Sequence, residues 1–497
     1  MRYSSTRDSS ASVSAAEAIA RGISPDGGLY VPESFPALSE ADFEALRKMN
    51  YSGRACMVLS RYLTDFSAEE IADSVAGAYT GGRFDNDLPA PLEELTDGVN
   101  ILELWHGPTC AFKDLALQIL PHLLTRSAKK TGDGKKTVIL VATSGDTGKA
   151  ALEGFRDVPD TEILVFYPED GVSPMQKLQM TTQEGKNVYV AAIQGNFDDA
   201  QTGVKRIFTD PAVAQKLAGA GMAFSSANSI NWGRLVPQVV YYVSAYCDLL
   251  NSSQPLDDGF DVVVPTGNFG NILAAYYAKR MGVPIRRLVC ASNANNVLTD
   301  FLRSGTYDKN RKFYTTISPS MDILVSSNLE RLLYDLTGRN ADQTGGWMAQ
   351  LSQGGRYTVD AETADKLREI FWADCCDDRE TKSVIREIYE TYGYLCDTHT
   401  AVAVGVYKKY KKETGATRPV VIASTASPFK FSASVLDAVA PEKAAGDDFE
   451  MLQKLSSATG WQIPAPLAGL AGRPVRFTDD CRQDNMVEVV YRRLGIQ

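Results

Sequence analysis

The stretch Val138-Ile-Leu-Val-Ala-Thr-Ser-Gly-Asp-Thr-Gly-Lys-Ala150 indicates the fold class of this 497-residue chain. Five apolar residues predict a buried strand, a turn of glycine and hydroxyl residues follows, and small residues then begin a helix. The same design returns at Val264-Pro-Thr-Gly-Asn-Phe-Gly270. A glycine-rich turn at a helix N-terminus directs several unpaired backbone N–H groups at one point, where an anion can bind. Two such turns could hold two anionic groups, although each could also be an ordinary strand-to-helix turn. Neither matches a Walker A loop or the G-x-G-x-x-G pattern.

Short apolar runs alternate with amphipathic stretches from about residue 100 onward. Continuous apolar strands separated by helices are typical of parallel sheets that are covered on both faces. The sequence therefore predicts an α/β fold. Strands are expected at 138–142, 163–166, 188–193, 262–265, 288–291, 420–423 and 486–491. Helices are expected near 113–125, 147–156, 174–184, 198–209, 234–250, 270–281 and 380–391.

Three local signals add detail outside this alternation. Residues 66–80 are expected to form a helix, with Ser67 as N-cap and Glu70 three residues later as its capping-box partner. The glycine pairs 345–346 and 354–355 are typical of loop tips. Pro89-Ala-Pro91 interrupts the pattern, so we expect a domain boundary there.

Composition and charge exclude several classes of function. With 51 Lys and Arg against 61 Asp and Glu, the net charge is −10, and no basic block offers the patch that a nucleic-acid binder needs. The apolar runs are far shorter than the roughly 20 residues of a membrane span, and the polar N-terminus lacks a signal-peptide pattern. We therefore expect a cytoplasmic protein that binds neither nucleic acid nor membrane. Eight scattered cysteines without a CxxC pair, and only three histidines, predict no metal site.

One lysine lies in an unusual context. Lys113, in Ala111-Phe-Lys-Asp114, stands among apolar and aromatic residues at the start of an expected helix. The helix dipole and burial would both disfavour its charged form, and a neutral amine is what a nucleophilic or Schiff-base lysine requires. The alternative is a lysine whose stem is buried while its amine reaches solvent.

Four motifs, in this order, resemble those of the threonine synthase family, which are pyridoxal-phosphate enzymes of the tryptophan-synthase-β-like fold. They are His106-Gly-Pro-Thr-Cys-Ala-Phe-Lys-Asp114, Thr143-Ser-Gly-Asp-Thr-Gly148, Pro265-Thr-Gly-Asn-Phe-Gly-Asn271 and Ser424-Thr-Ala426. The segments 3–7 and 24–32 resemble the leader of the same family. The resemblance is strongest over 1–295 and 395–435, and weak over 300–375 and after 440.

The resemblance implies a fold-type II architecture, with two parallel-sheet α/β/α subdomains, the cofactor in the cleft between them and an N-terminal domain specific to the family. We expect the N-terminal domain at 1–92 and a catalytic core at 93–440, with a smaller subdomain at about 138–240. A C-terminal extension would follow at 441–497.

The resemblance also implies how pyridoxal 5'-phosphate would be held. Lys113 would carry the cofactor as a Schiff base and then move protons, and the Thr425 hydroxyl would bond the pyridine nitrogen. A neutral hydroxyl cannot protonate that nitrogen as a carboxylate would, which suits β- and γ-chemistry more than transamination. The alternative for Thr425 is a strand-end cap. The expected ligands of the cofactor phosphate are Gly267, Asn268, Phe269, Gly270 and Asn271.

The implied substrate is O-phosphohomoserine, which would react with water to give threonine and phosphate. The expected ligands of its carboxylate are Ser144, Gly145, Asp146 and Thr147. Those of its phosphate are Asn228, Ser229, Asn231 and Arg234, with Gln176 and Lys177 as second candidates. The alternatives are a surface ion pair for Arg234 and a solvated helix face for Lys177.

Several points stay open at this level. The family usually has His-Pro after the threonine that bonds the pyridine, whereas this chain has Ser427-Pro428, which puts the packing of that loop in question. His122 is expected to pack against a helix, and His399 to be structural or to support the site from outside it. A serine/threonine dehydratase of the same fold, or a catalytically silent phospho-ligand-binding homologue, are the rival functions. A monomer or a homodimer is expected.

Overall fold

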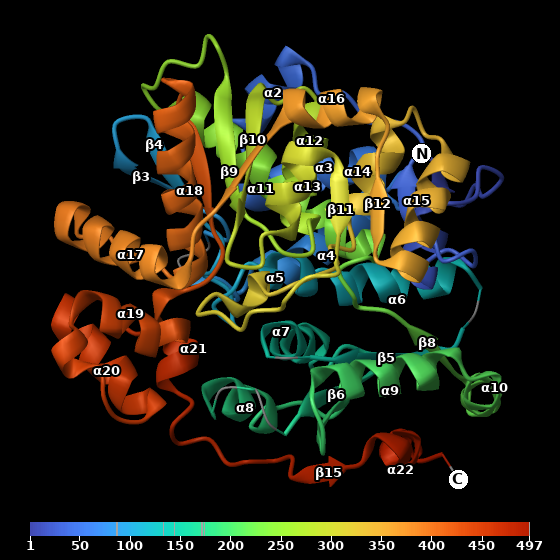
Figure 1. Cartoon of the computed structure of the whole chain (residues 1–497). Coiled ribbons are helices and arrows are strands. Elements are labelled where there is room, and N and C mark those ends of the chain that lie inside the picture. Colours follow the sequence, from blue (N-terminus) through green and yellow to red (C-terminus); the bar gives the residue numbers. More distant parts are fainter. Residues whose placement is uncertain (86–87, 133, 144, 170–171, 173, 497) are drawn as a thin grey trace.

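The computed structural model describes residues 1–85, 88–132, 134–143, 145–169, 172 and 174–496. Two sheets with helices on both faces lie one above the other, the larger in the upper part of Figure 1 and the smaller in the lower part. The predicted α/β class with two parallel-sheet bodies is confirmed. Ser144, one of the predicted carboxylate ligands, lies outside the described residues.

The larger sheet has six strands, and all neighbours run parallel except the edge strand β3. Strand β9, near the centre of this sheet, shows why the sequence 262–264 is continuously apolar. Val262 and Val264 pack in the core that includes helix α12, whereas Val263 packs in the core that includes α18. In sheet order the strands are β13 (Phe371–Cys375), β10 (Ile285–Ser292), β9 (Phe260–Pro265), β14 (Val420–Ser424), β4 (Val99–Glu103) and β3 (Leu92–Thr96). The helices around this sheet are α11 (Trp232–Asn251), α12 (Gly270–Arg280), α13 (Val297–Ser304), α16 (Ala361–Ile370), α17 (Asp378–Tyr392) and α18 (Thr398–Thr414).

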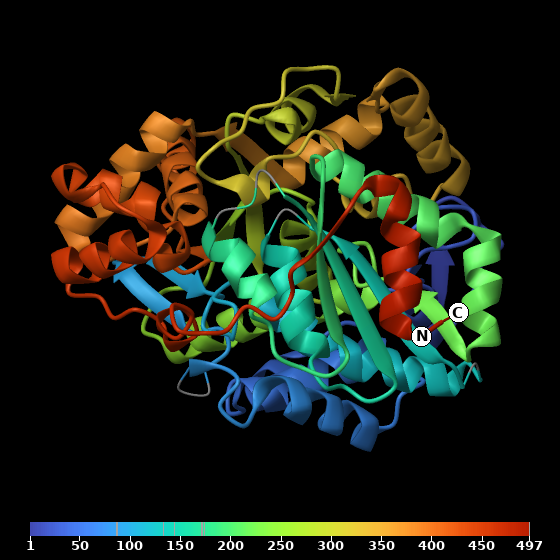
Figure 2. The ribbon, with the colours of Figure 1, turned by 90° about the horizontal axis from the view of Figure 1, so that it is seen from below.

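The smaller sheet has five strands, all parallel, and its edge strand β15 comes from the far end of the chain (Figure 2). In β5, as in β9, successive residues pack in different cores. Ile139 packs in the core shared with the larger body, and Val138 packs in a separate core. In sheet order the strands are β15 (Asp479–Cys481), β7 (Val188–Ile193), β6 (Thr161–Pro168), β5 (Lys136–Ala142) and β8 (Met222–Ser225). The helices around this sheet are α7 (Asp146–Phe155), α8 (Pro174–Thr181), α9 (Phe197–Thr209), α10 (Pro211–Gly219) and α22 (Met486–Leu494).

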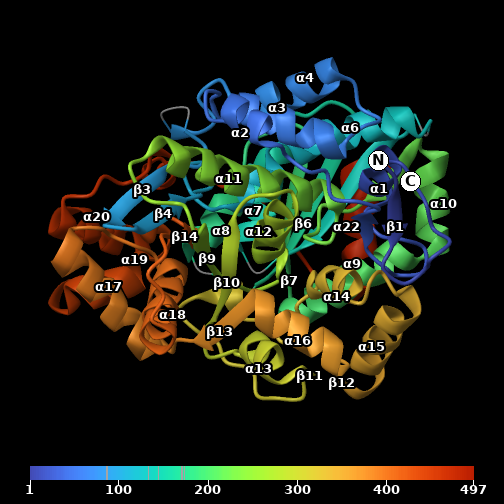
Figure 3. The ribbon, with the colours of Figure 1, turned by 90° about the horizontal axis from the view of Figure 1, so that it is seen from above.

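The N-terminal segment lies along one side of the larger body, where α2, α3 and α4 appear in blue in Figure 3. The predicted helix at 66–80 is α4, with the reciprocal capping box between Ser67 and Glu70 in place. Helices α3 and α1 pack against α11 and α6 respectively. The elements of this segment and the next are β1 (Tyr3–Ser5), α1 (Ala15–Arg21), β2 (Tyr30–Pro32), α2 (Glu40–Leu46), α3 (Tyr51–Tyr62), α4 (Ala68–Tyr79), α5 (Lys113–Leu117) and α6 (Leu120–Lys130).

The six expected strands between 138 and 423 are confirmed, whereas the strand expected at 486–491 is wrong. Those residues form helix α22, because Met486, Val489 and Val490 recur at helical spacing and are buried against the smaller sheet. The loop tip expected at 345–346 is also wrong, since both glycines lie inside α15. The helix expected at 113–125 is two helices, α5 and α6.

The remaining elements lie between 306 and 358 and after 428. Gly355, with φ 73°, ends α15 in the left-handed conformation that glycine adopts without strain. Among the described residues, no helix has both the length and the apolar character to cross a membrane. The elements are β11 (Thr306–Asp308), η2 (Pro319–Met321), α14 (Leu329–Leu336), α15 (Ala341–Gly354), β12 (Arg356–Thr358), η3 (Pro428–Phe431), α19 (Ser432–Val439), η4 (Pro441–Lys443), α20 (Asp448–Thr459), α21 (Ala465–Ala468) and η5 (Gln483–Asn485).

Candidate active site

Lys113 begins α5 and its amine faces a polar group of side chains. The side chain is 12% exposed, and Nζ lies 3.3 Å from Ser320 Oγ and 3.6 Å from Asp146 Oδ2. Burial and the nearby cations Lys430 and Arg234 lower the pKa of Lys113, while Asp146 opposes them. The net shift is downward, so the amine is biased toward its neutral form. Since α5 has only five residues, burial rather than the helix dipole is the main cause.

Asp146, at the start of α7, lies between two lysines. Lys430 Nζ is 2.7 Å from Asp146 Oδ1, its side chain is 2% exposed, and it also donates to the Thr109 carbonyl at 2.9 Å. Burial would raise the pKa of Asp146, but Lys430 and Lys113 hold it well below its ordinary value. The carboxylate is therefore ionised, and its side chain cannot receive a substrate carboxylate.

The backbone at the start of α7 still offers donors for an anion. The Gly145 and Gly148 N–H groups are already bonded to Thr143 Oγ1, at 3.0 and 2.9 Å. The N–H groups of Asp146 and Thr147 make no hydrogen bond to any described residue. In the predicted carboxylate site, these two are the free backbone donors among the described residues.

The turn at 267–271 between β9 and α12 presents its backbone N–H groups unpaired. None of these five groups bonds to another described residue, while the carbonyls of Gly267 and Asn268 accept from Ser326 Oγ at 2.7 Å and from the Asn328 N–H at 3.1 Å. A Cβ at Gly267 would come within 2.6 Å of the Ser320 carbonyl, so this close approach needs glycine. The turn therefore combines fixed carbonyls with free donors, which fits a bound phosphate.

Asn271 and Phe269 add to this fit. Phe269 adopts a left-handed backbone with φ 64° just before α12. Asn271 accepts hydrogen bonds from the hydroxyls of Tyr241 and Tyr242 through Oδ1, while its buried Nδ2 has no partner among the described residues. A buried donor without a partner normally has a ligand or water to bond.

Thr425 follows β14 directly and is tied to the start of α5. Its carbonyl accepts from the Phe112 N–H at 2.9 Å, and its side chain is buried. The Thr425 hydroxyl has no hydrogen bond among the described residues, whereas the hydroxyl of neighbouring Ser424 accepts from Trp105 Nε1 and Thr400 Oγ1, at 3.1 and 3.0 Å. Of these two hydroxyls, Thr425 is the one free to bond a ligand.

Ser427, which stands where the family usually has histidine, stabilises the loop after Thr425 locally. Its Oγ accepts from the Phe429 N–H at 3.3 Å, and its own N–H donates to the Cys110 carbonyl at 3.1 Å. The side chain and the backbone N–H of Ser427 thus hold this loop in place without the histidine.

Arg234 is a buried cation without a carboxylate partner in the described chain. Its residue is 4% exposed, and Nη1 donates to the Ala227 carbonyl at 2.7 Å. Nε finds no hydrogen-bond partner, and burial lowers the pKa of the guanidinium to about 10. At neutral pH the group stays charged, so the structure holds an uncompensated positive charge next to the Lys113 group.

The other residues predicted to bind the substrate phosphate with Arg234 differ in whether their side chains still have free hydrogen-bond donors. The Asn231 side chain caps α11 and donates to the carbonyls of Ile19 and Ser226, so no donor remains for a substrate. Asn228 is exposed, and Ser229 offers its carbonyl to Asn328 Nδ2 at 3.3 Å.

Lys177 is not brought into this group. It lies on α8 with an exposed side chain, and its amine is 6.0 Å from the centre of the Tyr167 ring. Its neighbour Gln176 does reach the group, because Nε2 donates to Asp146 Oδ1 at 3.2 Å.

Two residues that the sequence analysis did not assign to the site, Lys430 and Ser320, lie in its centre. Besides Lys430, Ser320 contacts Lys113 through its hydroxyl and donates its N–H to His399 Nε2 at 3.2 Å. His399 Nδ1 lies 2.6 Å from Asp397 Oδ2, so the ring carries its proton on Nδ1 and accepts at Nε2. The His399 role outside the site stays a prediction that these contacts support.

Family comparisons cover nearly the whole chain. Residues 2–79 match the threonine synthase N terminus, 87–425 match the pyridoxal-phosphate dependent enzyme family, and 400–489 match the threonine synthase C-terminal family. Threonine synthase of Pseudomonas aeruginosa is 38% identical over 478 residues, which cover 96% of this chain and 95% of that protein. Threonine synthase-like 1 of Homo sapiens is 42% identical over 85% of this chain, and the match covers only 58% of that longer protein.

Two solved structures match over the full length of the chain. The structure of PLP-bound threonine synthase from Brucella melitensis aligns with a TM-score of 0.88 at 36% identity, covering 100% of both chains. The structure of threonine synthase from yeast aligns with a TM-score of 0.88 at 31% identity, covering 100% of this chain and 99% of that one.

Proposed function

The chain belongs to the threonine synthase family of pyridoxal-phosphate-dependent enzymes, and we propose that it converts O-phosphohomoserine and water to L-threonine and phosphate. The observation that carries the proposal is the presence of two separate places for phosphate around one buried lysine. One is the turn 267–271 with its unpaired N–H groups, and the other is the buried, unpaired cation Arg234. A reaction that needs both a cofactor phosphate and a substrate phosphate requires two.

The residues of the site fit pyridoxal phosphate. The N–H groups of 267–271 and the free Nδ2 of Asn271 would hold its phosphate, the Thr425 hydroxyl would bond its pyridine nitrogen, and Lys113 would attach it. A permanently bound phosphate suits fixed backbone donors. When bound, the cofactor supplies the electron sink that makes protons of an amino acid removable.

The chain's own side chains would then position the substrate and move its protons. The neutral amine of Lys113 takes a proton from Cα, and the resulting ammonium is stabilised by Asp146 at 3.6 Å. Lys430 fixes the Asp146 carboxylate from the other side, so that it stays ionised while Lys113 changes charge. The Ser320 hydroxyl, 3.3 Å from the amine, holds the direction in which Lys113 points.

Arg234 would receive the group that leaves. A proton would leave Cβ as well as Cα. The bond between Cγ and the phosphate oxygen would then break, and the electron pair departs with the phosphate, which takes up one proton and whose charge the guanidinium neutralises. Cγ would gain a proton, the hydroxyl of water would add at Cβ, and a proton would return to Cα. A side chain suits this phosphate better than a backbone turn does, because the phosphate must enter and depart.

The test is the product of O-phosphohomoserine with the PLP-loaded protein. We expect L-threonine and phosphate in equal amounts, and no product from Lys113→Ala, which lacks the attachment point and the base. Formation of a 2-oxo acid and ammonia from serine or threonine, without threonine synthesis, would instead indicate a dehydratase. Binding of O-phosphohomoserine without turnover would indicate a silent homologue.

For its setting we propose the cytoplasm, with the chain acting on this small molecule as a monomer or a homodimer. The net charge of −10 supports a protein that does not associate with nucleic acid. Light scattering on the purified protein separates the two oligomeric states, and cell fractionation tests the compartment.

A further inference from the structure

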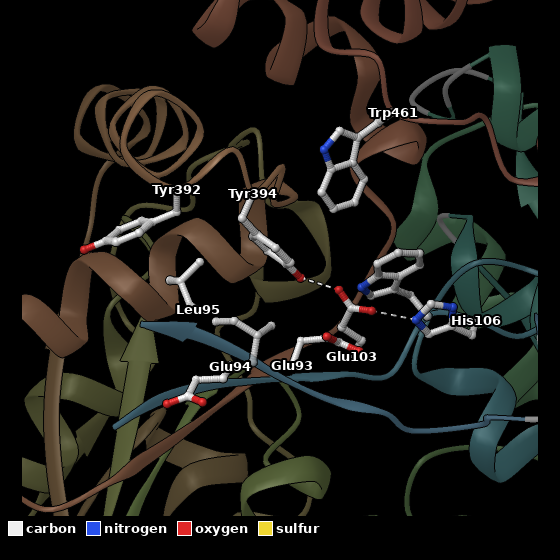
Figure 4. A pocket seen from close by; sticks show the side chains of 10 residues that line it. Glu93, Glu94, Leu95, Glu103, His106, Tyr392, Tyr394 and Trp461 are labelled. Carbon is white, nitrogen blue, oxygen red and sulfur yellow. Dashed lines mark hydrogen bonds and ion pairs between the residues drawn. The ribbon is translucent and has the colours of Figure 1, made fainter. Parts of the chain in front are cut away.

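A second cavity, apart from the Lys113 group, opens beside the edge of the larger sheet (Figure 4). Its volume is about 380 Å³, enough for a small organic molecule. Three separated segments form it: the strands β3 and β4 with the residues directly after β4, the end of α17 with the residues after it, and the segment after α20. Its lining residues are Glu93, Glu94, Leu95, Ile101, Glu103, Trp105, His106, Tyr392, Tyr394 and Trp461.

The floor of the cavity is one face of the β3–β4 pair. Glu93 lies opposite Ile101 in this antiparallel ladder, and Glu103 follows Ile101 by two residues, so the three side chains share a face. Glu94 lies opposite Asn100, whose side chain bonds Gln254, and so belongs to the other face. In Figure 4 the Glu93 side chain extends toward Glu103, while that of Glu94 extends away.

The charge on this floor is negative. Glu103 is buried and accepts from the Tyr394 hydroxyl at 2.7 Å, and its other oxygen is 2.7 Å from His106 Nε2. Burial and the charge of Glu103 raise the pKa of Glu93, while His106 opposes them. No lysine or arginine lines the cavity in the described part of the chain.

The walls are aromatic and held in place. Trp461 and Tyr394 meet edge to face, with ring centres 5.5 Å apart, and Trp461 Nε1 donates to the Gly393 carbonyl at 3.2 Å. Trp105 stacks on His106 with ring centres 4.2 Å apart. Tyr392 is 47% exposed, so it stands where the cavity meets solvent.

We propose that this cavity binds a small organic ammonium ion. Aromatic faces attract such cations through their ring quadrupoles, and carboxylates on one side of the cavity complement the charge. An anionic ligand would add negative charge beside Glu93 and Glu103, and a neutral ligand would add no positive charge there. This site is separate from the proposed reaction, because its carboxylates and rings contact neither Lys113 nor the turn 267–271 in the described contacts.

The test uses choline as the probe and 3,3-dimethylbutan-1-ol as its uncharged counterpart of the same shape. Isothermal titration of the PLP-loaded protein should give saturable binding of choline, and at least about tenfold weaker binding of the alcohol. Since the readout is binding rather than turnover, failure of this proposal and failure of the proposed reaction can be told apart. Absence of saturable choline binding, or equal binding of the two probes, would overturn the proposal.

Two variants with the same change of charge, Glu93→Gln and Asp97→Asn, and one variant of the aromatic wall, Trp461→Leu, locate the site. Glu93→Gln should weaken choline binding about five- to tenfold, and Trp461→Leu should weaken it by a similar factor. Asp97→Asn, at the exposed turn between β3 and β4 and outside the lining, should change the affinity by less than about twofold. Equal losses in Glu93→Gln and Asp97→Asn would mean that choline responds only to the overall charge of this hairpin, which would contradict binding in the cavity.

Discussion

Replacing Arg234 by methionine should leave the folded protein as stable as before, or more stable, while removing most of its activity. Burial lowers the pKa of Arg234 from 12.5 to about 10. At about 1.4 kcal/mol per pKa unit, the fold disfavours this charge by about 3 kcal/mol. Methionine removes that cost and fills similar space, and it loses the charge-assisted hydrogen bond to Ala227, worth about 1.5–3 kcal/mol. We expect the free energy of unfolding to stay unchanged or to rise by up to about 1.5 kcal/mol.

The same substitution should weaken the reaction of the phosphorylated substrate. A charge-assisted contact to phosphate contributes about 1.5–3 kcal/mol, so kcat/KM for O-phosphohomoserine should fall about tenfold to more than a hundredfold. Slow side reactions on unphosphorylated serine or threonine should change far less. The variant should still bind pyridoxal phosphate, since Arg234 is assigned to the other phosphate.

The assay compares unfolding of the PLP-loaded wild type and variant in urea, with and without inorganic phosphate. Phosphate should stabilise the wild type more than Arg234→Met, because a ligand stabilises only the state that binds it. Arg331→Met is the control: this arginine is also buried, but it donates to the Tyr30 carbonyl, to Asn328 Oδ1 and to the Ile230 carbonyl. Burial lowers the pKa of Arg331 to about 10 as well, so methionine would recover the same roughly 3 kcal/mol there. Three charge-assisted hydrogen bonds, at about 1.5–3 kcal/mol each, outweigh that gain, and we expect a net loss of about 2–6 kcal/mol.

The reasoning would be refuted if Arg234→Met lost as much stability as Arg331→Met. An equal loss of activity on phosphorylated and unphosphorylated substrates would have the same consequence. Arg234 would then support the fold or the cofactor, and the substrate phosphate would bind elsewhere.

Three further predictions concern other parts of the chain. Thr425→Ala should retain the cofactor and slow turnover about two- to tenfold, since one neutral hydrogen bond is worth about 0.5–1.5 kcal/mol. Thr425→Asp should shift the products toward abortive chemistry. If neither variant alters absorbance or products, Ser424 is the next candidate for the partner of the pyridine nitrogen. Lys430→Met should lower the free energy of unfolding by about 2–4 kcal/mol, and adding Asp146→Asn should recover part of this loss, whereas a neutral effect in urea would contradict a buried ion pair. Burial, Arg83 and Arg126 lower the pKa of His122 from 6.5 to about 4, so His122 must stay neutral in the fold. The stability present above pH 6.5 should therefore decrease by up to about 3 kcal/mol as pH falls through 4. The same decrease in His122→Gln would show that another group titrates.

The strands were predictable from the sequence because they are buried on both faces. Val262, Val263 and Val264 alternate between two cores, which makes the run apolar without a gap. The segment 486–491 has the same β-branched character, but it packs through Met486, Val489 and Val490 on one side only. With so short a run, helical and strand periods cannot be told apart until the packing partner is known.

The candidate site was predictable only where one local motif carries it. Lys113 and the turn 267–271 each lie in one short stretch of sequence. Ser320 contacts Lys113 itself, whereas His399 reaches the site through Ser320 and Lys430 through Asp146, so these three depend on the order of strands in the larger sheet. The strand order places residues more than 200 positions apart side by side, and no local pattern encodes it. Lys430 did carry a signal, since it stands between two phenylalanines, much as Lys113 follows one.

The most direct test of the account is to locate the lysine that carries the cofactor. Borohydride treatment of the PLP-loaded protein, followed by peptide mapping with mass spectrometry, should place a pyridoxyl group on the peptide that contains Lys113. Two other lysines, Lys149 and Lys430, have nearly buried side chains, and the same map shows whether either is modified. Modification of Lys113 alone is the predicted result, and a pyridoxyl group on Lys149 or Lys430, or on none of the three, would contradict it.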